Sequence, residues 1–146
     1  MTGAHSRALL RYGQQITGGG QKKMADAIVH RTKYEAFKRD AERAENSIPI
    51  RIKAYFLAAF HILELVVAED DLHIQQPQQA RAVIDSSPKV KGKTKQLLEN
   101  FHQLDKIRIE EVYGAGINGK NLKKAQRIFE TIEKACLEIL QEEISP

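Results

Sequence analysis

Residues 47–68 read SIPIRIKAYFLAAFHILELVVA, and no other stretch of the chain constrains the fold as strongly. Serine often caps a helix and proline is tolerated in its first turn, so Ser47 and Pro49 together predict a helix start. From there to Ala68 the sequence is apolar nearly all the way round a helix. Such a helix needs neighbours on several sides, so we expect it to be the central member of a bundle.

Further helices and short connections surround this central helix. The hydrophobic periodicity predicts helices over residues of about 21–46, 47–68, 78–84, 93–113 and 121–143, the third of them short. Apart from residues 107–110, nothing alternates as a strand would. We therefore predict an all-α fold, an antiparallel up-and-down four-helix bundle with a short extra helix between its second and third long helices. Residues 21–143 form this domain, and residues 1–20 form a flexible N-terminal arm.

The composition indicates one globular domain without a membrane span. The chain has 146 residues, of which 42% are hydrophobic and 29% charged, with a net charge of +4. Its longest hydrophobic stretch, residues 54–68, is interrupted by His61 and Glu64 and is shorter than the roughly 20 residues that span a bilayer. The first twenty residues contain no apolar run of a secretory signal, and the single cysteine, Cys136, fits a reducing compartment. We expect a cytoplasmic protein that does not associate with membranes.

Basic residues are unevenly distributed along the chain. They are concentrated in residues 22–53 and again in residues 89–95, whereas acidic residues collect at 69–71 and near the C-terminal end. This asymmetry permits contact with a polyanion such as RNA but does not require it, because most charged helix faces are simply solvated.

One arginine lies where the periodicity of the third long helix predicts a leucine. The apolar stripe of that helix consists of Leu97, Phe101, Leu104, Arg108 and Val112. A guanidinium stays charged and is costly to desolvate, so Arg108 should have a partner or a ligand. It either faces His61 and Glu64, which share one face of the central helix, or pairs with Glu111 of its own helix. In the first case Glu64 is buried; otherwise Glu64 reaches water at the edge of the bundle.

A glycine-rich segment, residues 114–121, satisfies GxGxxG and comes within one residue of a phosphate-binding P-loop. In a P-loop a serine or threonine holds magnesium, and here that position is Asn121. A helix, not a strand, precedes the segment, and the chain lacks the strands of a nucleotide-binding sheet. The pattern is therefore typical of a helix C-cap followed by a connection.

Metal ligation has one candidate pair in the sequence. His61 and Glu64 are three residues apart in the central helix and could offer two ligands. A di-iron bundle needs further Glu and Glu-x-x-His pairs from other helices, and neither His30 nor His102 has an acid at that spacing. We expect neither a metal ion nor another cofactor.

The central helix and the end of the third long helix resemble those of a known family. The segment 53–61, KAYFLAAFH, resembles the AYYAAFH helix of HEPN domains (higher eukaryotes and prokaryotes nucleotide-binding). Arg108, four further residues and then Tyr113 are similar to the arginine-x4-tyrosine ending of many small HEPN proteins. An amphipathic helix from about residue 121 completes a resemblance that covers residues of about 21–140.

The resemblance implies a bundle of four to five helices that pairs as a homodimer, with the arginine-bearing helix ends near the cleft between subunits. Nuclease members of the family carry arginine-x4-histidine and cut RNA without a metal ion. Here Tyr113 takes the place of the histidine. A phenol, whose ordinary pKa is about 10, is a poor general base at neutral pH.

We therefore expect binding of RNA, a nucleotide or another phosphate-bearing ligand in the dimer cleft, without efficient catalysis. The expected ligand-binding residues are Arg108, His61, Glu64 and Lys120. One alternative is a metal-independent endoribonuclease toxin of a toxin–antitoxin or phage-defence system, with Arg108 and Tyr113 as catalytic residues. Its partner would be an antitoxin or nucleotidyltransferase. The other alternative is a structural, partner-binding bundle with no ligand.

Overall fold

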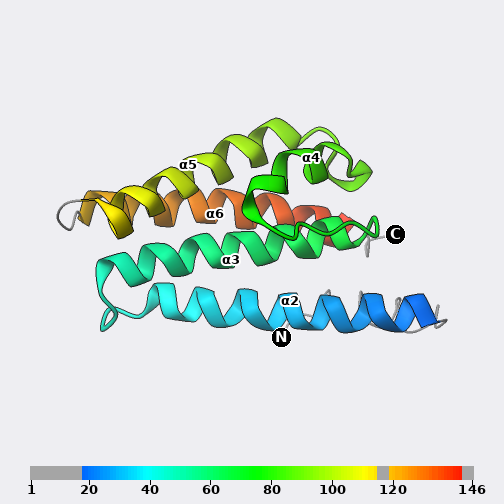
Figure 1. Cartoon of the computed structure of the whole chain (residues 1–146), viewed down its shortest axis with the longest axis horizontal. Coiled ribbons are helices and arrows are strands. Elements are labelled where there is room, and N and C mark those ends of the chain that lie inside the picture. The colour runs from blue at the N-terminus through cyan, green and yellow to red at the C-terminus, as the bar shows by residue number, and fades with distance from the viewer. Residues whose placement is uncertain (1–17, 115–118, 143–146) are drawn as a thin grey trace.

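The computed structural model describes residues 18–114 and 119–142, and the side chains of residues 26–114 and 119–141. Every regular element within these ranges is helical, so the predicted all-α class is confirmed (Figure 1). The α-helices are α2 (Gly18–Glu42), α3 (Ile48–Ala68), α4 (Ala80–Asp85), α5 (Thr94–Tyr113) and α6 (Gly119–Glu142). Two single-turn 3₁₀ helices flank α4, namely η1 (Pro77–Gln79) and η2 (Pro88–Val90).

The helix boundaries agree with the predicted ones to within a few residues. α2 begins at Gly18, so the last three residues of the predicted arm are helical, and residues 1–17 lie outside the described part. α2 ends at Glu42, four residues before the predicted end. Of the glycine-rich connection between α5 and α6, residues 115–118 also lie outside the described part.

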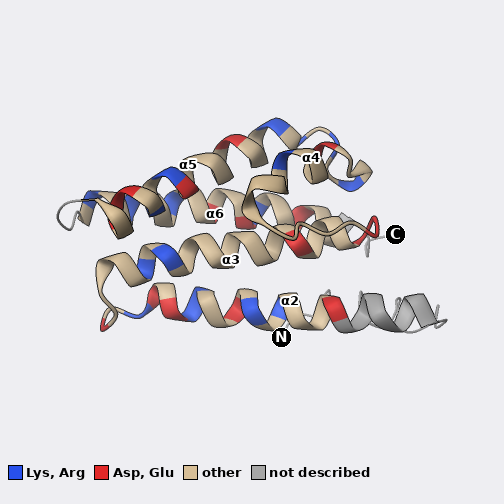
Figure 2. Cartoon of the chain, in the orientation of Figure 1, with Lys and Arg blue, Asp and Glu red and all other residues tan. Residues whose placement is uncertain are grey.

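The helix α3 is the central element of the fold, as its sequence predicted. It packs against α2 on one side and against α5 and α6 on the other (Figure 1). Fourteen of its 21 residues are buried, including the unbroken run 61–68. Figure 2 shows the middle of α3 almost free of charged residues, whereas α5 and the coloured part of α2 carry charges along their length. Its burial on several faces is the source of its stability, since an isolated helix of this length is only marginally stable in water.

The connection that follows α3 brings the chain back along the same helix. Asp71 adopts a left-handed conformation (φ 61°), which reverses the chain direction just after α3 ends. The N–H of Leu72 donates to the carbonyl of Val67 over 3.1 Å and closes the turn. Residues 72–76 then run beside α3 before η1 begins, which places His73 and Ile74 next to the last turns of α3.

Tyr34 of α2 connects that helix to α6 through a polar contact. Its side chain is buried, and its hydroxyl donates a hydrogen bond to the carboxylate of Glu133. Lys38, one turn further along α2, lies 2.8 Å from the same carboxylate. The Tyr34 and Phe129 rings lie 6.5 Å apart in the core beneath this contact.

Among the described residues, no helix combines the length and the apolar character needed to cross a bilayer.

Candidate functional site

Arg108 lies at the edge of the buried face of α5, not at its centre. The buried residues of α5 are Leu97, Phe101, Leu104, Ile107 and Glu111. After Leu104 the buried stripe therefore continues through Ile107, and Val112, which the predicted stripe included, is 36% exposed. A helical period of 3.6 residues allows the next buried position to fall three or four residues later, and here it falls three later.

The guanidinium of Arg108 has partners other than those predicted from the sequence. Its Nη2 and Nε atoms donate to Oδ1 of Asp105 over 2.6 and 2.9 Å. Its Cζ atom lies 4.6 Å from the centre of the Phe56 ring on α3, within the range of a cation–π contact. Arg108 therefore pairs with Asp105, three residues earlier in α5. This ion pair takes the place of both predicted pairings, the one with His61 and Glu64 and the one with Glu111.

Arg108 also lines a groove between α5 and the η1–α4 segment, which we call the arginine groove. Its volume is about 460 Å³, within the range of ordinary ligand sites. Its charged and ionisable lining residues are Arg81, His102, Asp105 and Arg108, and its apolar lining includes Leu98 and Phe101. Two guanidiniums against one carboxylate leave the groove with a net positive charge. A guanidinium presents its donors in a planar fork that fits phosphate or carboxylate oxygens, so the groove is suited to an anion.

The other predicted site residues lie outside this groove. His61 is buried on α3, Tyr113 is 76% exposed at the end of α5, and Lys120 is exposed in the first turn of α6. Glu64 is buried in a separate cluster. Of the predicted ligand-binding residues, the structure therefore places only Arg108 in the groove, and it brings His61 and Glu64 together elsewhere.

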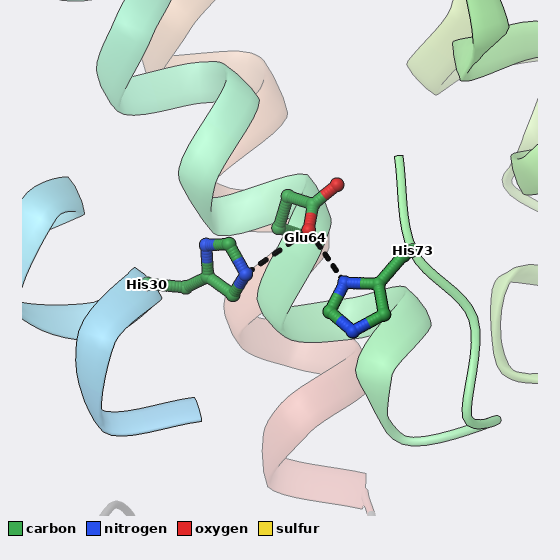
Figure 3. A group of neighbouring side chains, drawn as sticks. All are labelled: His30, Glu64 and His73. Atoms are coloured by element: carbon green, nitrogen blue, oxygen red, sulfur yellow. Dashed lines mark hydrogen bonds and ion pairs between the residues drawn. The ribbon is translucent and has the colours of Figure 1, made fainter. Parts of the chain in front are cut away.

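That second cluster, which we call the His–Glu cluster, consists of His30, His61, Glu64 and His73. Figure 3 shows His30, Glu64 and His73 converging from α2, from α3 and from the connection after α3. The Glu64 Oε2 atom lies 3.0 Å from Nε2 of His30 and 3.4 Å from Nδ1 of His73. The Oε1 atom accepts a hydrogen bond from the backbone N–H of Ile74. Glu64 is only 2% exposed, so these contacts provide the hydrogen bonds that a buried carboxylate needs.

Both histidines that approach Glu64 also use their second ring nitrogen. The Nδ1 atom of His30 lies 3.1 Å from Nδ1 of His61. The Nε2 atom of His73 lies 3.4 Å from a carboxylate oxygen of Asp26. The result is a continuous chain of polar contacts from Asp26 through His73, Glu64 and His30 to His61, which spans α2, α3 and the connection between α3 and η1.

His61 ends this chain in an environment that disfavours its charged form. It is buried, and the ring of Phe37 stacks on it at 5.7 Å. Burial, with a smaller contribution from the neighbouring His30, lowers the pKa of His61 to about 4. Its imidazole is therefore neutral at physiological pH, with one ring nitrogen that donates and one that accepts.

Of the site residues that we did not predict, only His30 has a signal in the sequence. His30 lies three residues after Ala27 and four before Tyr34, both buried, so its spacing places it on the apolar face of α2. His73 has no periodic signal because it lies in a connection. Arg81 is an exposed residue of a short helix, and nothing local indicates that α4 faces α5.

Comparisons of the chain with protein-family models, with curated proteins and with solved structures find no match.

Proposed function

We propose that this is a HEPN-like helical protein that binds a phosphate-bearing ligand, RNA or a nucleotide, in the arginine groove without efficient catalysis. The observation that carries the proposal is that Arg81 and Arg108 line one groove of about 460 Å³. The resemblance of residues 53–61 and of the Arg108-x4-Tyr113 ending to HEPN domains supports the same class of ligand. In this proposal the four long helices form an antiparallel up-and-down bundle.

The geometry of Arg108 supports a role in binding. A guanidinium carries five N–H donors, and two of those on Arg108 are directed at Asp105. The remaining donors are available to a ligand, because the side chain is 21% exposed and lines the groove. Arg81 is exposed on α4, opposite this wall, and adds a second cation. Phosphate oxygens carried by a nucleotide or by an RNA backbone are the acceptors that such a pair favours.

The position of Tyr113 supports binding without efficient cleavage. A catalytic residue has to approach the same phosphate as Arg108, yet Tyr113 is 76% exposed and does not line the groove. A phenol is in addition a weak general base at neutral pH.

One observation favours a second candidate function, a metal-independent ribonuclease. His102 lines the same groove as Arg108 and supplies the imidazole that the Arg-x4-Tyr ending lacks. Histidine is the side chain that most often transfers protons in catalysis. If RNA is cut, we expect His102, and not Tyr113, to act as the base.

We further propose that two copies of the chain pair through the last turns of α5. Ile109, Val112 and Tyr113 are 47%, 36% and 76% exposed, and their spacing places them on one face of the helix. This apolar face adjoins Arg108 in sequence, so pairing across it would bring two arginine grooves near the interface, as the HEPN resemblance implies. Sedimentation analysis should show a dimer for the wild type and a monomer for Ile109→Asp. A wild-type monomer at all accessible concentrations would remove the dimer from the proposal.

The function is tested with a short labelled single-stranded RNA. We expect salt-dependent binding by the wild type, and a roughly tenfold or greater loss in Arg81→Ala and Arg108→Ala, since a hydrogen bond to a charged group contributes about 1.5–3 kcal/mol. Arg127→Ala is the matched control, because Arg127 is an exposed arginine of α6 that does not line the groove. Equal binding by all four proteins would contradict the proposal. Cleavage of the RNA that is lost in His102→Ala would instead establish the ribonuclease.

A further inference from the structure

The His–Glu cluster has the composition and spacing of a metal-binding site, and it is separate from the arginine groove. His30 Nε2, Glu64 Oε2 and His73 Nδ1 can each act as a ligand, and these three atoms lie within 4.8 Å of one another. Ligand atoms about 2.0–2.2 Å from a tetrahedral zinc ion are separated by roughly 3.2–3.6 Å. The two O–N separations here, 3.0 and 3.4 Å, are already close to that spacing. The third separation, between the two ligand nitrogens, is at most 4.8 Å, so the imidazoles would rotate toward a common point on binding.

The outer contacts of the two histidines supply an independent observation. Histidines that bind metals almost always donate their other ring N–H to a carboxylate or another acceptor, which fixes the orientation of the ring. His73 directs its second nitrogen to Asp26 at 3.4 Å, and His30 directs its second nitrogen to His61 at 3.1 Å. His61 is buried, and a ring nitrogen of its imidazole can accept this hydrogen bond.

We propose that His30, Glu64 and His73 bind one divalent transition-metal ion of the zinc class, with a coordination position open to solvent. Imidazole together with carboxylate suits zinc and neighbouring divalent ions better than magnesium or calcium, which prefer oxygen ligands alone. Two neutral imidazoles and one carboxylate bring a single negative charge to a dication. His73 is 47% exposed, so an ion can enter from its side, whereas Glu64 lies at the closed end of the site.

The bound ion would join three segments that are far apart in sequence. One ligand comes from α2, one from α3 and one from the connection after α3 (Figure 3). In the absence of an ion, the same segments are joined through hydrogen bonds to Glu64. Metal binding should therefore raise the thermal stability of the protein, because an ion that binds only the folded state stabilises it by mass action.

The direct test is a titration of the purified full-length chain, first freed of metal with a chelator, with Co²⁺ and then Zn²⁺. We expect one Co²⁺ per chain, the strong visible absorption of four- or five-coordinate cobalt, and its loss when Zn²⁺ displaces the ion. His73→Ala removes an exposed ligand and should abolish this absorption while circular dichroism stays unchanged. Glu64→Gln should do the same, and if it fails to fold, His73→Ala still decides the question. His102→Ala is the matched control, since His102 is an exposed histidine of α5 outside the cluster.

Asp26→Asn tests whether the outer partner of His73 supports metal binding or whether the imidazoles are close together by chance. It leaves all three ligands in place and should weaken Zn²⁺ binding about 10–100-fold, the usual cost of losing an outer partner of a ligand histidine. The proposal is overturned if the wild type shows no stoichiometric binding, or if His73→Ala binds Co²⁺ as the wild type does. Either result would mean that the cluster only holds the connection after α3 in place through hydrogen bonds. Because no ligand of the ion lines the arginine groove, failure here would leave the RNA-binding proposal untouched.

Discussion

Asp105 accepts two hydrogen bonds from the guanidinium of Arg108, one from Nη2 at 2.6 Å and one from Nε at 2.9 Å. Both residues line the arginine groove. The carboxylate holds the arginine against the Phe56 ring, and it also places a negative charge where an anionic ligand would bind. Asp105 therefore orients Arg108 and competes with its ligand at the same time.

The first prediction concerns this competition. Asp105→Asn keeps a hydrogen-bond acceptor for Arg108 but removes the negative charge, so we expect the mutant to bind labelled RNA several-fold more tightly. Its stability should change little, because an ion pair three residues apart on a helix contributes about 0.2–0.5 kcal/mol. Glu99→Gln is the control, an exposed carboxylate of α5 that does not line the groove. Weaker binding by Asp105→Asn would mean that orientation of Arg108 matters more than charge.

A second prediction follows from the lowered pKa of His61. The unfolded chain takes up a proton on His61 below its ordinary pKa of about 6.5, whereas in the folded protein burial holds that pKa near 4. Stability contributed by the neutral form is therefore fully present above about pH 6.5 and is lost as the pH falls toward 4, by up to about 3 kcal/mol. In urea unfolding across this range, His61→Gln should show a shallower loss than wild type. If the free energy of unfolding of His61→Gln falls with pH as steeply as that of the wild type, groups other than His61 dominate the pH dependence. His102→Gln serves as the exposed control.

The third prediction concerns the contact between α2 and α6. Burial raises the pKa of Tyr34, so its hydroxyl stays protonated and donates to Glu133. Tyr34→Phe removes this donor while Lys38 still pairs with the carboxylate, and we expect a loss of about 1–3 kcal/mol in the free energy of unfolding. Tyr113→Phe makes the same change at a side chain that is 76% exposed and should have no measurable effect. Equal stabilities in chemical denaturation would show that the buried contact is neutral.

Local sequence signals were sufficient to predict the helices. The start of α3 follows Ser47, which has an extended backbone, and Pro49 stands in its first turn, as the sequence indicated, although the Ser47 side chain makes no capping hydrogen bond. The predicted helix ranges also left gaps on either side of residues 78–84, and the structure has its connections there. Helix starts and connections depend on residues only a few positions apart in the chain, so a single sequence is enough to predict them.

The candidate sites were less predictable because they depend on which segments meet in space. The periodicity of α5 predicted Arg108 after Leu104 on the buried face, and this was wrong because the packing of α5 in the bundle buries Ile107 instead. The path of the connection that carries His73 depends on the left-handed turn at Asp71 and on the hydrogen bond from Ile74 to Glu64. A sequence pattern cannot show such contacts.

The most direct measurement of the central claim is a titration of the isotope-labelled protein with a nucleotide, followed through the arginine side-chain Nε–Hε signals in nuclear magnetic resonance spectra. Ligand binding in the arginine groove should shift the signals of Arg81 and Arg108 together, at one common affinity, and leave that of Arg127 in place. Unchanged signals for Arg81 and Arg108, while RNA or a nucleotide binds elsewhere, would contradict the account.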